Sequence, residues 1–229
     1  MKRYLITGLM LLALFGCSSP SDAIKNVDEA KASFLSLGDS YTIGESVDQQ
    51  ERWPVQLVSR LNEKGLPVNA PRIIAKTGWT TANLLDAMEA NLNEEKFDLV
   101  SVLIGVNNQF QNKSIEGYEE DLRIIFTQAI SYSKSGKDGV FVVSIPDYGV
   151  TPFGASNEAE ISKEIEEFNT VCKRLATEFE LDFYNITPIS KKAKQDRELV
   201  APDGLHPSGK MYRLWVDEFI EKVAVKLPN

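Results

Sequence analysis

The chain has 229 residues, which suits a single globular domain, and 43% of them are hydrophobic, enough to build a substantial core. The formal net charge is −8 and there is no basic cluster, which argues against nucleic-acid binding and against purely electrostatic attachment to anionic membranes. We therefore expect no nucleic-acid partner, and we expect any membrane association to come from a lipid.

The N-terminus has the pattern of a secretory signal. Residues 1–3 are basic and residues 4–16 are apolar, and this run is shorter than the roughly 20 residues that span a bilayer. It ends in Leu-Phe-Gly-Cys at Cys17, which resembles a bacterial lipobox, where the cysteine is lipidated and becomes the new N-terminus. Residues 18–30 are expected to form a flexible tether, and the folded domain is expected at 31–229. These features predict an exported lipoprotein with signal peptide 1–17, anchored to a membrane of the bacterial cell envelope. A plain cleaved signal peptide is the alternative.

Short apolar runs alternate with longer amphipathic segments along the rest of the chain. The apolar runs predict strands at 33–37, 72–75, 99–104, 140–145 and 181–186. Apolar residues at helical spacing predict helices at 54–64, 80–92, 115–132, 157–179 and 207–225. Strands that alternate with helices in this way predict an α/β fold, with a five-stranded parallel sheet covered by helices on both faces.

Polar and glycine-containing motifs follow three of the predicted strands and precede the last helix. They are Gly38-Asp39-Ser40-Tyr41, Thr77-Gly78-Trp79-Thr80, Gly105-Val106-Asn107-Asn108 and Asp203-Gly204-Leu205-His206-Pro207. Ligands of parallel sheets bind beyond the carboxyl ends of the strands. We therefore expect these four motifs to form the functional site.

The residue types in these motifs suit acyl transfer. A serine hydroxyl such as that of Ser40 needs a base to take its proton, and His206 is the only histidine in the chain. Asp203, three residues earlier, is close enough to accept the Nδ1 proton of His206, as the acid of a Ser-His-Asp triad does. The tetrahedral intermediate also needs hydrogen-bond donors, which the backbone of Gly78, the side-chain amide of Asn107 and the backbone of Ser40 offer.

These motifs resemble those of the SGNH or GDSL hydrolases. Ser40, Gly78, Asn107 and His206 match in order the four residues that name the SGNH group, and Asp203 matches the acid of its Asp-x-x-His block. The resemblance spans roughly residues 33–219. It implies a flavodoxin-like three-layer α/β/α sandwich, ester hydrolysis through an acyl-enzyme on Ser40, and an oxyanion hole built by Ser40, Gly78 and Asn107.

The sequence departs from the family pattern at two positions. Asn108 stands where the family often has aspartate, which leaves the geometry of that loop open, and Tyr41 stands where it often has leucine. We expect Asp39 to hold the loop through backbone hydrogen bonds and Asp147 not to be catalytic. Cys172 lies in a helical pattern and is interpreted as a core residue.

The sequence leaves the substrate open. Acyl lipids or lysophospholipids, acetylated polysaccharide and thioesters all remain possible esters, and a non-catalytic envelope lipoprotein that binds a glycan or lipid is the alternative function. One histidine and no cysteine cluster cannot build a usual zinc site, so we expect neither a metal nor a cofactor. Four aromatic residues near predicted loop ends suit an acyl or sugar pocket and core packing equally well: Trp53, Trp79, Tyr148 and Phe153.

Overall fold

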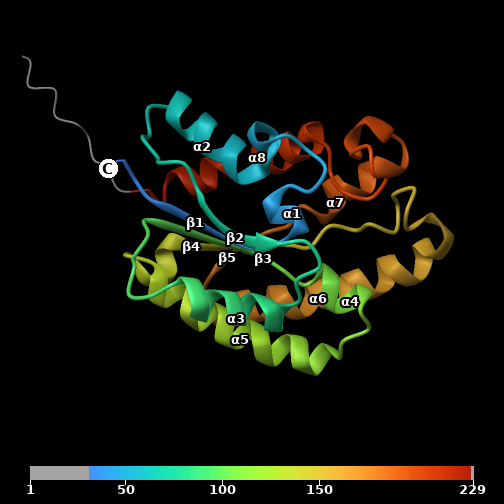
Figure 1. Ribbon diagram of the computed structural model, residues 1–229, viewed down its shortest axis with the longest axis horizontal. Helices are drawn as coiled ribbons and strands as arrows, with labels where there is room; N and C mark the ends of the chain where they lie inside the picture. Colours follow the sequence, from blue (N-terminus) through green and yellow to red (C-terminus); the bar gives the residue numbers. More distant parts are fainter. Residues whose placement is uncertain (1–30, 228–229) are drawn as a thin grey trace, which may run out of the picture.

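The computed structural model describes residues 31–227, which form an α/β/α sandwich (Figure 1). The fold class predicted from the sequence is therefore confirmed. The expected signal peptide, Cys17 and the tether at 18–30 lie outside the described residues. Within the described part of the chain, no helix is long and apolar enough to cross a membrane.

The central sheet has five parallel strands in the order β2-β1-β3-β4-β5. Their bounds are β1 Phe34–Asp39, β2 Arg72–Lys76, β3 Leu99–Leu103, β4 Val140–Val143 and β5 Asp182–Tyr184. The chain runs outward from β1 to β2 and then crosses back to β3, so the strand order reverses beside β1. Such a reversal leaves a crevice at the carboxyl ends of the strands, where open α/β sheets bind ligands.

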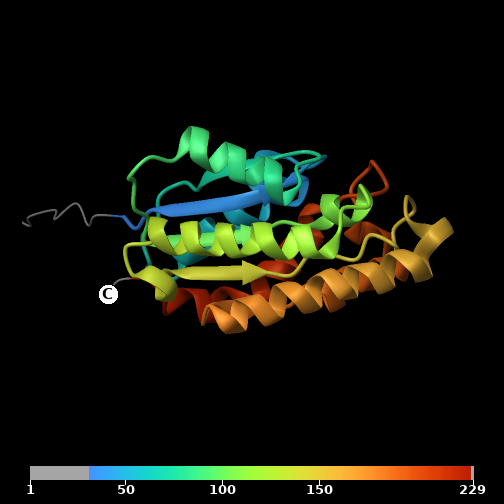
Figure 2. The same ribbon diagram turned by 90° about the horizontal axis from the view of Figure 1, so that it is seen from below.

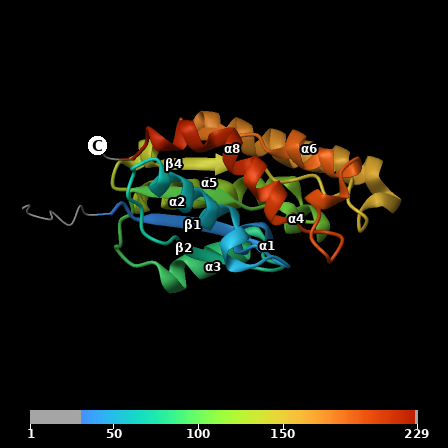
Figure 3. The same cartoon turned by 90° about the horizontal axis from the view of Figure 1, so that it is seen from above.

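Helices cover both faces of the sheet (Figures 2 and 3). Helices α2 (Trp53–Glu63) and α8 (Gly209–Ala224) pack together on one face. Helices α3 (Thr81–Asn91), α5 (Ile115–Tyr132) and α6 (Glu158–Glu178) cover the other, with α5 between its two neighbours. Each of these helices turns a stripe of buried apolar residues toward the sheet, which is the periodicity that predicted them.

Short helices were not predicted, because a single turn is too short to show a periodic pattern. They are α1 (Ser40–Ile43), α4 (Val106–Phe110) and α7 (Thr187–Ser190), with 3₁₀ turns at Gln49–Glu51, Gly136–Gly139, Ala155–Asn157, Lys191–Lys194 and Arg197–Leu199. Helices α1 and α4 follow β1 and β3 almost directly. They therefore carry two of the four motifs.

Most predicted boundaries differ from the structure by one or two residues; the strand predicted at 140–145, for example, ends at Val143. Two of these differences have clear local reasons. The last helix begins at Gly209 rather than at 207, because Ser208 is its N-cap and accepts a hydrogen bond from the backbone N–H of Met211 at 3.3 Å. Strand β5 ends at Tyr184 rather than at 186. Beyond Tyr184 the backbone N–H of Ile186 donates to the hydroxyl of Ser144 at 2.9 Å and not to a backbone carbonyl of the neighbouring strand.

The core assigns roles to two residues that the sequence singled out. Trp53 is fully buried, and its ring packs edge-on against Phe219 at a centroid distance of 5.9 Å. Trp53 is thus a core residue and lines no ligand pocket. Cys172 is also buried, and burial raises the pKa of its thiol to about 12, as expected for a packing residue.

Candidate active site

Ser40 is the first residue of α1 and lies directly beyond the carboxyl end of β1. Its turn is held from the N-terminal side by Asp39, whose Oδ1 accepts the backbone N–H of Tyr41 at 3.0 Å, so the role expected for Asp39 is confirmed. The helix stops after one turn at Gly44, which has a φ of +72° and donates its N–H to the Ser40 carbonyl at 3.0 Å. Ser40 therefore sits in a tight strand-to-helix turn and is only 3% exposed.

Glycine at position 38 is required for this turn. A Cβ built on Gly38 would clash with the side chain of Thr42 in α1 and with the backbone carbonyl of Leu103 in β3. Movement of a side chain could not relieve the clash with the Leu103 carbonyl, because that oxygen belongs to the backbone of the neighbouring strand. The Gly-Asp pair before Ser40 thus has separate tasks, close packing and capping.

Asp203 and His206 form a hydrogen-bonded pair in the loop before α8. His206 Nδ1 lies 2.6 Å from Asp203 Oδ2, and Asp203 Oδ1 accepts the backbone N–H groups of Leu205 and His206 at 2.9 and 3.0 Å. The hydroxyl of Ser46 donates a further bond to Asp203 Oδ2 at 2.7 Å. Partial burial alone would raise the pKa of Asp203, but these hydrogen bonds outweigh it and hold the pKa well below its usual range. The carboxylate is therefore charged at neutral pH and suited to orienting the imidazole.

Two contacts join the Ser40 segment to this pair. The ring of Tyr41, the residue after Ser40, lies 5.1 Å from the imidazole of His206 between centroids. Ser46, in the loop after α1, is the donor to Asp203 already described. Among residues 31–227 the imidazole makes one hydrogen bond, to Asp203, and none to Ser40. Such bonds in unliganded enzymes often tighten only when substrate binds.

Asn107 and Gln111 hydrogen-bond to the loop that carries Gly78. Gly78 has a φ of +83°, which favours glycine, and a Cβ built on it would meet nothing within 4 Å. Asn107 Nδ2 donates to the carbonyl of Trp79 at 3.0 Å, and Gln111 Nε2 donates to the carbonyl of Gly78 at 3.0 Å. An amide has two N–H donors, so Asn107 keeps one for a ligand. Trp79 itself is half-buried and packs against the core.

Asn108 explains how the departure from the family pattern is accommodated. Its side chain is buried; Oδ1 accepts the backbone N–H of Thr81 at 3.0 Å, and Nδ2 donates to the Thr81 hydroxyl at 2.7 Å. Thr81 in turn donates to Asp121 at 2.6 Å, so its hydroxyl oxygen must accept from residue 108. An amide can supply that proton and a carboxylate cannot. Asn108 thus ties the start of α4 to the start of α3, which fixes the loop that carries Gly78.

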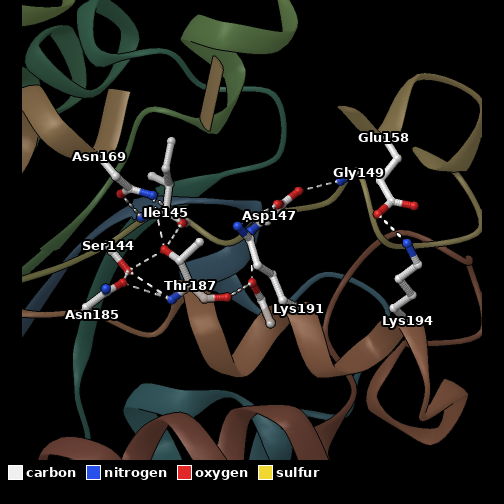
Figure 4. A network of polar contacts seen from close by, with 11 residues as sticks. Ser144, Ile145, Asp147, Gly149, Glu158, Asn169, Asn185, Thr187, Lys191 and Lys194 are labelled. Carbon is white, nitrogen blue, oxygen red and sulfur yellow. Dashed lines mark hydrogen bonds and ion pairs between the residues drawn. The ribbon is translucent and has the colours of Figure 1, made fainter. Parts of the chain in front are cut away.

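A buried network holds the loop that follows β4 (Figure 4). Asp147, whose side chain is fully buried, accepts the backbone N–H of Gly149 at 2.9 Å, and its own N–H donates to Ser190 Oγ at 2.9 Å. Lys191 lies 3.7 Å from the other carboxylate oxygen. Asp147 therefore has a structural role, and it positions Tyr148, which borders a cavity with Tyr41 and His206.

Asp39 has a second property that follows from its burial. The side chain is fully buried, and one carboxylate oxygen, Oδ2, has no hydrogen-bond partner in the described part of the protein. This burial raises the pKa of Asp39 from 3.8 to about 7, against the lowering effect of backbone hydrogen bonds.

We expect Asp39→Asn to become more stable than the wild type as the pH rises. Between pH 4 and 7 the unfolded chain loses the Asp39 proton while the folded chain keeps it, so wild-type stability falls through this window and the cost is complete above pH 7. The difference between variant and wild type should grow by about 2–3 kcal/mol between pH 5 and pH 8. Urea unfolding at the two pH values measures it. A difference that does not change with pH would show that Asp39 is not held in this way.

Comparison with known proteins supplies the family. The family model described as "GDSL-like Lipase/Acylhydrolase family" matches residues 36–214, most of the chain. The chain belongs to the GDSL-like lipase/acylhydrolase family. No curated protein sequence matches it. Among residues 31–227, no group of three or more His, Cys, Asp and Glu side chains could hold a metal ion.

Solved structures share the fold of this GDSL-like hydrolase. The lipase/acylhydrolase from Enterococcus faecalis superposes with a TM-score of 0.69 at 22% identity, covering 86% of this chain and 97% of that one. TesA superposes with a TM-score of 0.68 at 20% identity, covering 85% and 99%. Axe2, an acetylxylan esterase from Geobacillus stearothermophilus, gives 0.65 at 18% identity, covering 84% and 94%. At these identities the likeness shows the fold alone, and esterases are among the proteins that share it.

Proposed function

We propose that this GDSL-like hydrolase is a serine esterase that cleaves carboxylic esters through an acyl-enzyme on Ser40. His206 takes the proton of the Ser40 hydroxyl as it attacks the ester carbonyl, and the imidazolium then gives that proton to the departing alcohol. Asp203 fixes the Nδ1 proton and stabilises the imidazolium. Water, activated by the same imidazole, releases the acid and regenerates Ser40.

The oxyanion of the tetrahedral intermediate is assigned to three donors: the backbone N–H groups of Ser40 and Gly78 and the free amide N–H of Asn107. Because Asn107 and Gln111 hold the two carbonyls of the 78–79 segment, that loop is set before substrate arrives. Preorganised donors cost no reorganisation during the reaction and contribute about 3 kcal/mol each to transition-state stabilisation.

The observation that carries the proposal is the hydrogen bond of 2.6 Å between His206 and Asp203, beside the residue that follows Ser40. This is the orientation that a general base needs. The proposal is tested with p-nitrophenyl acetate, butyrate and decanoate. We expect turnover with at least one of these esters. A folded protein that hydrolyses none would favour the alternative, a lipoprotein that binds a glycan or lipid without catalysis.

We also propose that the protein is exported and held at the cell envelope by lipidation of Cys17. The support is the basic, apolar and lipobox-like order of residues 1–17, which precede the described fold. Acyl chains on Cys17 would supply the membrane affinity that a chain of net charge −8 does not gain from anionic lipid headgroups.

Cys17→Ser is expected to move the full-length protein from the membrane fraction to the soluble fraction when it is produced in a bacterium. Ultracentrifugation followed by immunoblotting measures the distribution, and intact mass shows whether the N-terminus carries lipid. Cys172→Ser, which leaves the anchor in place, is the matched control. If the Cys17→Ser protein remained in the membrane pellet after a salt wash, the anchor would lie elsewhere.

A further inference from the structure

Three aromatic rings form a cluster, here called the aromatic triangle, next to two loops of the candidate active site. The centroids of Phe110, Tyr148 and Phe153 are 6.1 to 6.3 Å apart. Phe110 and Phe153 are each 53% exposed, more than any other aromatic side chain among residues 31–227. Tyr148, by contrast, is buried. The two phenylalanines expose apolar surface to solvent, and packing within the protein does not require this exposure.

The aromatic triangle is attached to the proposed catalytic loops on two sides. Phe110 is in α4, three residues after Asn107. The backbone N–H of Phe153 donates to the carbonyl of Gly204 at 3.0 Å, in the loop between Asp203 and His206. A ligand on these rings would therefore reach the proposed site from the side of His206, which must protonate the leaving alcohol.

Hydrogen bonds hold the third ring in place. The hydroxyl of Tyr148 donates to Gln109 Oε1 at 2.8 Å, and Gln109 Nε2 donates to Glu164 at 2.7 Å. Asp147 fixes the same loop by accepting a hydrogen bond from the backbone N–H of Gly149. The aromatic triangle is therefore preorganised and loses little conformational freedom when a ligand binds.

The aromatic triangle lines a cavity of about 340 Å³. Most of the other residues that line it carry amide, hydroxyl or carboxylate groups, among them Asn112, Ser156, Asn157 and Glu160. A hydrocarbon chain placed here would cover these groups without giving them partners, which is unfavourable. An anionic group would be repelled by the carboxylates. The neighbouring cavity at Tyr41, Tyr148 and His206 is about 20 Å³, room for one water molecule and not for an acyl chain.

We propose that this cavity is a subsite for a sugar ring, and that the natural substrates are carbohydrate esters whose sugar hydroxyl is the leaving group. A pyranose presents an apolar C–H face to an aromatic ring and hydroxyl groups at its edge to amides and carboxylates. The inference rests on the proposed serine esterase. In the reaction Ser40 Oγ bonds to the acyl carbon, the bond from that carbon to the sugar oxygen breaks, and His206 returns its proton to the sugar oxygen.

The test compares an ester that carries a sugar with one that does not. For wild type, Phe110→Ala, Phe153→Ala and Glu160→Gln, kcat/KM is measured with acetylated methyl β-D-glucopyranoside and with p-nitrophenyl acetate. We expect the ratio of the two values to fall by about tenfold in each variant, the order expected when part of a pocket wall is lost. Ile124→Ala, an exposed apolar residue of α5, is the matched control and should keep the wild-type ratio.

Direct binding separates this inference from the proposed function. In the Ser40→Ala background, saturation-transfer NMR with methyl β-D-glucopyranoside should show ring contacts that Phe153→Ala removes. Phe110→Leu and Phe153→Leu keep an apolar side chain without an aromatic face, so they cover the case in which an alanine variant fails to fold. Unchanged ratios in all variants, or a selective loss with p-nitrophenyl decanoate or with acetylcholine, would overturn the sugar subsite. Full turnover by Ser40→Ala would instead overturn the esterase mechanism and leave the binding result standing.

Discussion

Replacing Ser40 by alanine is expected to lower kcat for p-nitrophenyl acetate by roughly 10⁴- to 10⁶-fold, with the fold intact. The hydroxyl is the atom to which the acyl group bonds, and no neighbouring group can take its place as nucleophile at the same position. The residual rate should come from the oxyanion donors and from binding, which need no covalent intermediate. Stopped-flow release of p-nitrophenol measures the effect.

The matched control for this variant is Ser59→Ala, which removes an exposed serine from α2, away from the candidate site. Its kcat should equal that of the wild type. Circular dichroism and thermal unfolding of Ser40→Ala must match the wild type, so that loss of rate cannot come from unfolding. A Ser40→Ala protein with wild-type rates would remove the nucleophile from the mechanism.

Replacing His206 by alanine should have an effect of the same order, because Ser40 cannot act without its base. The chain has no second histidine that could substitute for it. Free imidazole in the buffer should restore part of the rate, since the cavity left by the ring borders Tyr41 and Tyr148. A loss of activity that imidazole does not reverse, together with an altered fold, would leave only a structural role for His206.

Asp203→Ala provides the graded comparison. The loss should be smaller than that of the His206 variant by roughly 10²-fold, because the acid orients the imidazole and does not itself react. The hydrogen bonds from Ser46 and His206 hold the pKa of Asp203 well below its usual range. Asp203 therefore stays charged at mildly acid pH, so a fall in wild-type activity there must come from protonation of another group. The activity of Asp203→Ala should still fall as the pH is lowered. Equal losses in the two variants would contradict this division of roles.

The sheet and its long helices were predictable because their signals are repeated over many residues. A run such as Leu99–Leu103 is apolar at every position except Ser101, and it becomes a strand covered on both faces. Helices α5 and α6 show several turns of apolar spacing. Prediction failed at single turns, where α1 and α4 offer no period to detect.

The four motifs were predictable as chemistry, since each places a characteristic residue after a strand or in the last loop. The structure shows Asp203 and His206 in contact, and it shows Asn107 bonded to the loop of Gly78. Ser46 was missed, because a lone serine in a loop carries no signal until the fold brings it 2.7 Å from Asp203, 157 residues away. The same holds for the bond between Asn108 and Thr81, which depends on how two loops dock.

The aromatic residues show a different limit. Trp53 and Phe153 both stand near predicted loop ends, yet Trp53 lies in the core and Phe153 is half exposed. From the sequence, both suit a ligand pocket and core packing equally well. Only packing decides between them, because Trp53 faces Phe219 of α8 whereas Phe153 is held outward by its bond to Gly204.

Labelling with a fluorophosphonate tests the central claim most directly, because this reagent reacts with a serine that a histidine has activated. The account predicts one adduct per chain, found on Ser40 by peptide mapping, and little labelling of His206→Ala under the same conditions. An adduct on another residue of the intact protein, or an equal rate of labelling without His206, would contradict it.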